Sequence, residues 1–153
     1  MAEKNKKEEK VEQGQLSGFN LPAYQLTFFR RVLGMERLGA EDAKVRNHFV
    51  FEFLVPILNK IDVQVGEIRD KYAMRNANGS IKVTEDGAID YGENDKVSFK
   101  AFNNLMEENV FVPIENQEVF RHIFDLFSNT KYQMNEEETT MFNDIVNVLK
   151  VIK

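Results

Sequence analysis

The chain has 153 residues, of which 42% are apolar, so it is long enough to form one hydrophobic core. Its 25 acidic and 20 basic residues give a net charge of -5, which disfavours a protein whose main task is to bind nucleic-acid phosphates. The absence of cysteine excludes disulfides, thiolate metal sites and a cysteine nucleophile. No apolar run is typical of a membrane span or a secretion signal, and we therefore expect an intracellular protein.

The first twenty residues differ in composition from the rest of the chain. Residues 1–20 mix Lys and Glu and hold few large apolar side chains. Such a segment buries too little surface to offset the entropy lost on ordering. We therefore expect a flexible charged arm over residues 1–20 and a single domain over residues 21–153.

The domain is predicted to begin with a helix after Asn20. Pro22 is tolerated in the first turn of a helix, and Gly39 is a typical stop. Apolar residues between Tyr24 and Met35 recur at helical spacing and form a stripe that includes Phe28. This stripe is predicted to face the core.

A second, longer helix is predicted over residues 40–73. Its apolar residues recur at steps of three and four from Val45 to Tyr72. If it were unbroken, it would be about 50 Å long, which is longer than a small compact domain needs. Pro56 removes a backbone donor within it, which predicts either a kink near residues 52–56 or two abutting helices.

The periodicity then changes from helical to alternating. Residues 80–83 and 88–91 alternate, and Glu85, Asp86 and Gly87 between them are typical of a hairpin turn. Further helices are predicted over residues 96–108, around residues 119–127 and from Asn135 onward, with a short strand at residues 110–112. Asn135 and Glu138 have the spacing of a capping box. The fold class is therefore α+β and mostly helical, with one long helix, shorter helices, a small β-hairpin and an extra strand.

The sequence favours no catalytic residue, metal or cofactor. Asn76, Asn78, Gly79 and Glu85 fit a calcium-loop template, but Met74 stands where its first carboxylate belongs, so a turn is the better interpretation. The chain has two histidines far apart in sequence, and it lacks a nucleophile elbow and a glycine-rich phosphate loop. The acidic runs fall at predicted helix ends, where the helix dipole accounts for them. We therefore expect a protein that is not an enzyme.

Thirteen phenylalanines suggest a surface for another protein in addition to a core. Phe29 and Phe51 fall outside the main apolar stripes, and Arg30 and Arg31 follow Phe29 directly. Aromatic residues beside arginine are typical of interface centres. We therefore predict Phe29, Arg30, Arg31 and Phe51 as protein-interaction residues and Phe28 as a core residue, with complete burial within one chain as the alternative.

The chain resembles a group of small, uncharacterised tailed-bacteriophage proteins. The likeness rests on residues 67–73 with the Asn78–Gly79 loop, and on residues 102–108, 110–114 and 134–138. It covers about residues 21–153, and the longer charged arm and Pro56 depart from it. The resemblance implies phage origin, a helical pair with a β-hairpin, and no known enzymatic activity.

Two functional hypotheses follow, and neither involves a membrane or direct nucleic-acid binding. In the first, the protein is a component or assembly partner of a phage particle that binds other phage proteins or itself, in the virion or the infected-host cytoplasm. In the second, it inhibits or modulates one host protein. Residues 21–84 carry a net charge of +3 and residues 85–153 carry -8, so the acidic half could imitate nucleic acid at a basic site. A small hydrolase is a third class, with the least support.

Overall fold

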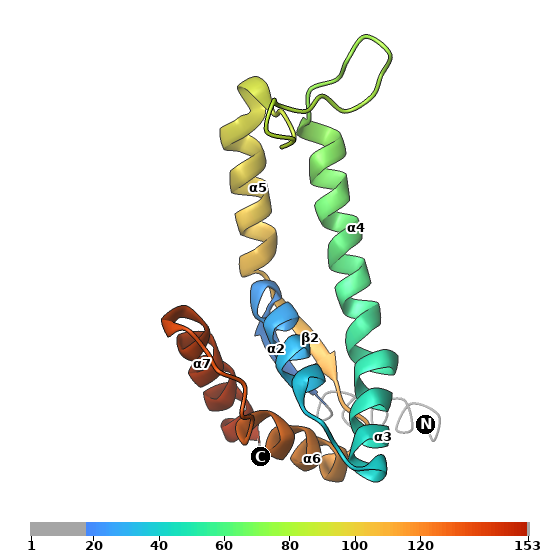
Figure 1. Ribbon diagram of the computed structural model, residues 1–153, viewed down its shortest axis with the longest axis vertical. Coiled ribbons are helices and arrows are strands. Elements are labelled where there is room, and N and C mark those ends of the chain that lie inside the picture. Colours follow the sequence, from blue (N-terminus) through green and yellow to red (C-terminus); the bar gives the residue numbers. More distant parts are fainter. Residues whose placement is uncertain (1–17, 153) are drawn as a thin grey trace, which may run out of the picture.

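The structure is a computed structural model that describes residues 18–152, and its elements form a head and a projecting stalk (Figure 1). Helices dominate, which confirms the predicted α+β, mostly helical class. In chain order the elements are β1 (Gly18–Pro22), α2 (Ala23–Met35), α3 (Ala40–Phe49), the π-helical segment η1 (Val50–Leu54), α4 (Val55–Tyr72), the 3-10 helix η2 (Gly92–Asn94), α5 (Asp95–Glu107), β2 (Asn109–Pro113), α6 (Gln117–Ser128) and α7 (Glu136–Ile152).

The head contains a two-stranded antiparallel sheet that the sequence only half predicts. The expected strand at residues 110–112 is β2, and it pairs with β1 so that Gly18 lies opposite Pro113. Phe19 and Leu21 alternate along β1 and are buried, as in a strand with one face on a core. The assignment of residues 18–20 to a flexible arm is therefore wrong, and the first helix begins at Ala23 rather than after Asn20. Residues 1–17 of the predicted arm lie outside the described residues.

Helix α2 runs through the middle of the head and contacts β1, α5, α6 and α7. The Phe29 ring is at the centre of an aromatic cluster, with its centroid 5.8 Å from Phe19, 6.3 Å from Phe49 and 4.9 Å from Phe127. Leucine, isoleucine and valine side chains from α2, α6, α7 and β2 complete the core around these rings. Burial of this apolar surface is the main term that stabilises the head.

The long helical segment changes from α to π geometry close to residues 52–56, where the sequence predicts a kink or two abutting helices. Helices α3 and α4 are joined by η1, in which the Val55 N–H donates to the Val50 carbonyl five residues earlier. Pro56 follows at the start of α4. The continuous segment of α3, η1 and α4 is called the rod below. Pro56 has no N–H to donate, and the wider π turn before it lets the rod continue without a break in the helical path.

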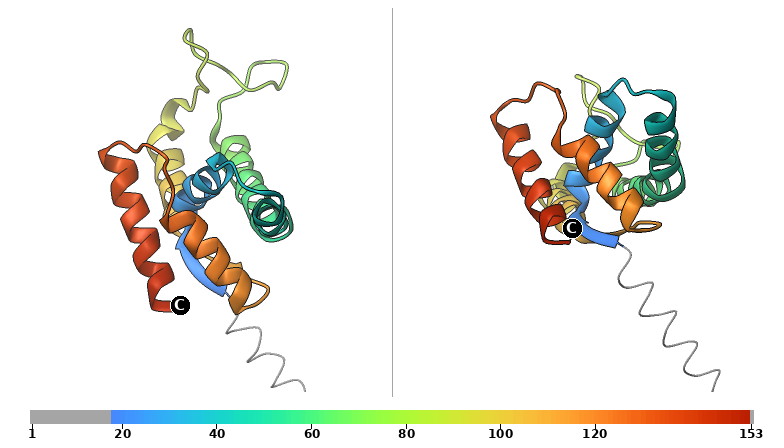
Figure 2. Two further views of the ribbon diagram at one scale, coloured as in Figure 1. Left: turned by 60° about the horizontal axis from the view of Figure 1, so that its bottom comes forward. Right: turned by 90° about the horizontal axis from the view of Figure 1, so that it is seen from below.

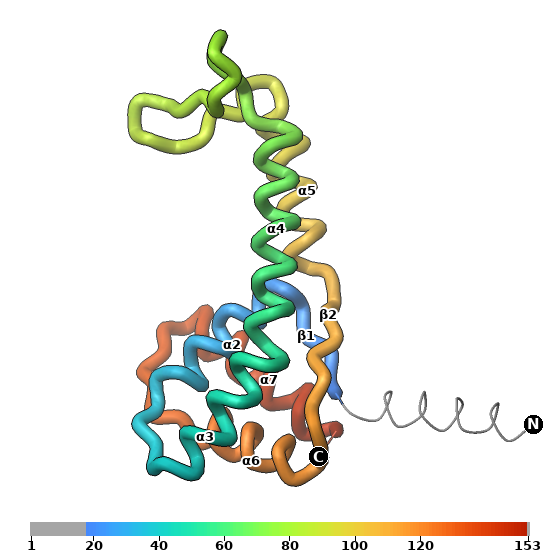
Figure 3. Tube along the Cα trace, turned by 90° about the vertical axis from the view of Figure 1, so that its right-hand side faces the viewer, coloured from blue at the N-terminus to red at the C-terminus, as the bar shows by residue number. Residues whose placement is uncertain are grey.

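Beyond the head, α4 and α5 run antiparallel and form the stalk (Figures 1 and 3). Of the α4 residues, only Ile61 is fully buried, because two helices alone cannot enclose each other's apolar faces. Residues 73–91 form the tip, where the predicted hairpin is present as a turn with a single bridge, Val83 to Ile89. Gly87 has a φ of 85°, a value that favours glycine in this turn.

Helix α7 begins with the predicted capping box. The Glu138 N–H donates to Asn135 Oδ1 at 2.8 Å, and the Asn135 N–H donates to Glu138 Oε1 at 3.3 Å. Two backbone donors that lack helical partners are thereby satisfied. Among the described helices, none is long and apolar enough to cross a bilayer.

Candidate protein-interaction groove

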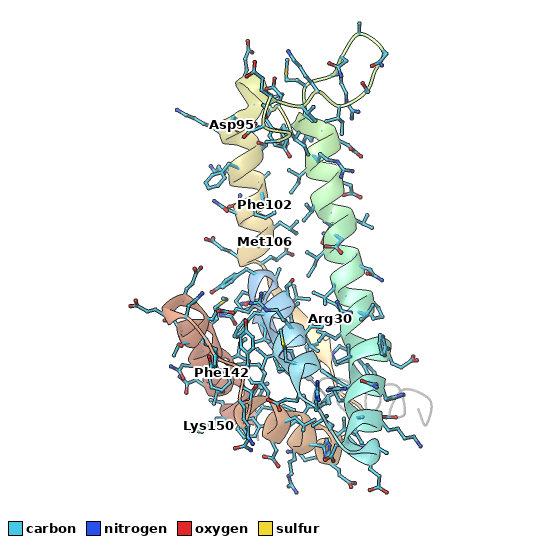
Figure 4. All side chains as sticks on the ribbon, in the orientation of Figure 1. Arg30, Asp95, Phe102, Met106, Phe142 and Lys150 are labelled. Atoms are coloured by element: carbon cyan, nitrogen blue, oxygen red, sulfur yellow. The ribbon has the colours of Figure 1, made fainter. Side chains whose placement is uncertain are left out.

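A groove of about 440 Å3 lies between α2 and the segment formed by α3 and η1. Figure 4 shows Arg30 on the side of α2 that faces the rod. Three arginines and one aromatic ring dominate the groove, and among the described residues no carboxylate lines it. Its lining residues are Thr27, Arg30, Arg31, Gly34, Arg46, Asn47, Val50 and Phe51.

The amphipathic pattern of α2 produces one wall of this groove. Thr27, Arg30, Arg31 and Gly34 follow the spacing i, i+3, i+4 and i+7, which places them on one face of the helix. The remaining faces carry the apolar residues that pack into the head. The polar face of α2 is therefore the one left open between the two helices.

Arg46 fixes α3 against the end of α2. Its Nη1 donates to the carbonyls of Leu33 at 3.2 Å and Glu36 at 2.7 Å, and its Nε donates to Asn47 Oδ1 at 3.2 Å. Carbonyls at the C-terminal end of a helix lack helical partners, so a guanidinium satisfies them well. Arg46 thus holds the two walls together and adds positive charge to the groove.

Arg31 is engaged within the chain as well as bordering the groove. Its Nη2 forms an ion pair with Glu138 Oε2 at 2.8 Å, and its guanidinium lies 5.6 Å from the Phe28 ring centroid and 5.9 Å from that of Tyr132. The Tyr132 hydroxyl donates to the same carboxylate at 3.0 Å, and this hydrogen bond raises the pKa of Tyr132. Arg31 therefore connects α2 to α7, and the Glu138 carboxylate neutralises part of its charge.

Arg30 and Phe51 are the groups that the fold leaves free. Arg30 is exposed and makes no hydrogen bond or ion pair within the described part of the chain. The Phe51 side chain is 60% exposed, whereas Val50 and Leu54 of the same π-helical segment are buried in the core. The groove thus presents an unpaired cation beside an uncovered aromatic ring.

The structure contradicts the prediction that Phe29 belongs to an intermolecular surface. Phe29 is 0% exposed and contacts rings from three other elements. Phe28 is buried, as predicted. The reason is that α2 is surrounded by partners from the sheet and from several helices, so its buried arc is wide enough to include two adjacent phenylalanines. Complete burial within one chain, the alternative, is correct for Phe29.

The prediction from sequence omitted Thr27, Arg46 and Asn47. Their signal is helical spacing: Thr27 stands three and four residues before the predicted arginines, and Arg46 and Asn47 stand four residues before Val50 and Phe51. What sequence alone cannot supply is the pairing of the two faces across the groove. That pairing depends on the turn between α2 and α3.

The polar side chains of the loop at the stalk tip form hydrogen bonds with one another. The Ser80 N–H and hydroxyl donate to Asn78 Oδ1 at 3.0 and 2.6 Å, and Asn76 Nδ2 donates to the Ser80 hydroxyl at 3.0 Å. Gly79 has a φ of 85° in this turn. Over residues 18–152, no group of three or more His, Cys, Asp or Glu side chains is arranged to hold a metal ion.

Each histidine in the described chain is close to a carboxylate from another element. His48 of α3 lies 3.5 Å from Glu115, and His122 of α6 lies 3.1 Å from Asp42 of α3. These contacts connect the base of the rod to the segment around α6. The two histidines are therefore groups that connect elements of the head.

Comparisons with known proteins identify no relative of the chain. No protein-family model matches the chain, and no curated protein or solved structure is detectably similar to it. The chemistry of the groove therefore comes from its residues alone. Guanidinium groups, an amide and an open phenyl ring fit a partner surface that carries carboxylates beside apolar side chains.

Proposed function

We propose that the protein is a non-enzymatic interaction protein of a tailed bacteriophage, a virion component or assembly partner that acts in the particle or the infected-host cytoplasm. One observation carries the interaction role: Arg30 and Phe51 stand uncovered in the same groove. Aromatic and arginine side chains dominate the energetic centres of protein interfaces. The resemblance of residues 67–73, 102–108, 110–114 and 134–138 to small phage proteins supports the phage setting.

The groove suits protein binding better than catalysis. Its lining offers guanidinium groups for charge-assisted hydrogen bonds and a phenyl ring for apolar contact, while its one hydroxyl, on Thr27, has no base among the lining residues. An acidic partner residue at Arg30 and an apolar one at Phe51 would each lose contact with water. Such anchors are worth about 2 kcal/mol or more each at an interface centre.

Particle composition tests this proposal. A phage lacking the gene is complemented with the wild-type chain, with Arg30→Glu/Phe51→Ala, or with the control Arg121→Glu, which reverses an exposed arginine on α6. We expect mass spectrometry to find the wild type and the control in purified particles at the same copy number. We expect the groove variant to be depleted although its melting temperature is unchanged. Absence of the wild-type chain from particles and from their assembly intermediates would refute the virion role.

A host-directed inhibitor is the second candidate, favoured by an acidic run that extends from the stalk tip into α5. Residues 83–95 hold five acidic and no basic residues. In this case the chain would form a stoichiometric complex with one host protein. That complex would be lost in Glu85→Lys/Asp86→Lys and retained in Arg30→Glu, the reverse of the pattern expected for a groove partner.

A further inference from the structure

Acidic residues follow one another from the second turn of the stalk tip to the start of α5. Residues 83–95 contain Glu85, Asp86, Asp90, Glu93 and Asp95 and no Lys or Arg. Among the described residues, Asp90 is the one of these five that forms an ion pair, with Lys82 at 3.9 Å. The Thr84 hydroxyl donates to Asp86, and this bond lowers the pKa of Asp86. Residues 73–95 also contain Arg75 and Lys82, so this end of the stalk carries a net charge of -3.

The tip and the groove lie on the same side of the molecule. In Figure 3 the tip loop at one end and helices α2 and α3 at the other project to the same side of the stalk. Seen from below in Figure 2, the tip, α2 and α3 again lie along one edge. The negative tip and the positive groove thus face the same direction from opposite ends of the stalk.

The stalk also has an uncovered apolar seam. A hollow of about 200 Å3 is lined by Val65 and Ile68 of α4 and by Phe99 and Phe102 of α5. Phe99 is 66% exposed. A second hollow between the same helices includes β2 residues, and β2 lies on the other side of the stalk in Figure 3. The Phe99 seam is also lined by Tyr91, Asp95 and Ser98, and it therefore lies at the tip end of the stalk.

We propose that the groove and the seam receive a second copy of this chain, arranged antiparallel, with each acidic tip in the partner's basic groove and the two seams packed together. This inference rests on the proposed function and names the partner of its groove. The two ends are complementary in charge, and an apolar seam between them is complementary to itself, which are the requirements of a two-fold interface.

A single chain cannot make this contact with itself. The 18 residues of α4, about 27 Å of helix, separate Phe51 in the groove from the tip. The groove and the tip are held apart by that length, so the charges can meet only between molecules. The arrangement also closes after two copies, because each copy has one groove and one tip and both are used.

Sedimentation of the full chain tests the pairing. We expect a mass that rises with concentration and stops at two copies, with a dissociation constant that increases with added salt. Arg30→Glu alone and Glu85→Lys/Asp86→Lys alone should each weaken pairing on the order of tenfold. The variant with all three changes should recover affinity, because the swapped charges attract again. Arg121→Glu and Asp144→Lys, which change exposed charges on α6 and α7, serve as matched controls and should pair like the wild type.

Chemical cross-linking tests the orientation. The chain has no cysteine, so Thr27→Cys/Asp86→Cys introduces one thiol in the groove and one at the tip. A short bis-maleimide should join two chains covalently through this variant. The single variants Thr27→Cys and Asp86→Cys should give little product, because like positions lie at opposite ends of an antiparallel pair.

The outcomes separate this inference from the proposed function. A chain that is monomeric at all concentrations, a charge swap that fails to restore pairing, or assemblies larger than two would each overturn the antiparallel pair. If such a monomer still enters particles through its groove, the proposed function stands and only the self-pairing is wrong. If pairs form but particles never contain the chain, the pairing stands and the virion role is wrong.

Discussion

At the scale of single residues, the division between Phe29 and Phe51 is decided by the backbone around them. Both side chains fall outside the apolar stripes of the sequence. Phe29 is surrounded because α2 crosses the centre of the head, whereas Phe51 is turned outward in a π-helical segment whose neighbouring residues supply the core contacts. Composition and spacing treat these two residues alike, and only tertiary packing distinguishes them.

Truncation of these two rings should therefore have opposite effects. Phe29→Ala should lower the free energy of unfolding by about 3 to 5 kcal/mol, because it opens a cavity among three other rings. Phe51→Ala should change it by less than about 0.5 kcal/mol, as for most exposed positions. Urea unfolding followed by circular dichroism measures both values. A similar loss in the two variants would mean that Phe51 contributes to the core.

Glu36 should make the stability of the head depend on pH. Its carboxylate accepts hydrogen bonds from the Thr130 hydroxyl at 2.8 Å and the Lys131 N–H at 2.9 Å. These bonds, the Lys131 backbone bond first, lower the pKa of Glu36 below its ordinary value of 4.5. A carboxyl with a lowered folded-state pKa stabilises the fold above its unfolded-state pKa and loses that contribution as the pH falls through the folded-state value.

We therefore expect Glu36→Gln to destabilise the protein by about 1 kcal/mol at pH 7. The difference from wild type should shrink as the pH falls below 4.5 and should vanish below the folded-state pKa, where both side chains are neutral. Thermal unfolding at several pH values measures it. A difference that stays constant down to pH 3 would show that the carboxylate charge is not responsible.

At the scale of elements, the sequence predicts those parts whose signals are local. The helical periods, the capping box at Asn135 and the interruption before Pro56 all depend on residues within a few turns of one another. Strand β1 is different. Its five residues alone do not predict a strand, because the strand with which they pair lies far along the chain. The predicted tip hairpin keeps only one bridge because neither of its faces is covered, so side-chain burial does not extend the pairing.

Gly18 is the residue on which close approach of the two strands depends. A Cβ at this position would lie 2.5 Å from the Val112 carbonyl oxygen and would also overlap the Phe111 ring. Gly18→Ala should therefore reduce stability by about 1 to 3 kcal/mol, because backbone must move to admit the methyl group. Gly34→Ala is the matched control: nothing lies within 4 Å of its Cβ, and it should stabilise helix α2 slightly. Chemical denaturation compares the two, and equal stability of both variants would refute the steric argument.

At the scale of the whole molecule, the length of the predicted rod already indicates a part that extends beyond one compact core. The structure places that excess in the stalk, where α4 leaves the head. The sequence does not reveal which side of the stalk faces the groove, because that depends on how α2 packs against the rod. For the same reason the candidate site is only partly predictable. The sequence points to Arg30, Arg31 and Phe51 one by one, but it does not predict that the α2 face and the α3–η1 face lie opposite each other across one groove.

The tip should be separable from the stability of the head. The Met74 N–H donates to the Asp90 carbonyl at 2.8 Å, so the two ends of the intervening loop already lie together. Replacement of residues 75–89 by two glycines should leave the melting temperature within a few degrees, because this segment contributes no side chain to the core. Scanning calorimetry measures the change. A fall comparable to that of Phe29→Ala would show that the tip is part of the cooperative unit.

The pairing of β1 with β2 has a consequence for the order of folding. The two strands are separated in the chain by α2, the rod and all of α5, so closing the sheet directly would mean ordering a long loop. The antiparallel α4 and α5 fold on local contacts and return the chain to its starting point, where the Ala23 N–H meets the Glu108 carbonyl at 3.0 Å. A formed stalk thus shortens the effective loop, and Phe19 and Leu21 stay uncovered during synthesis until residues near 113 have emerged. Substitutions that weaken the stalk should therefore slow refolding of the head even where they leave its equilibrium contacts intact.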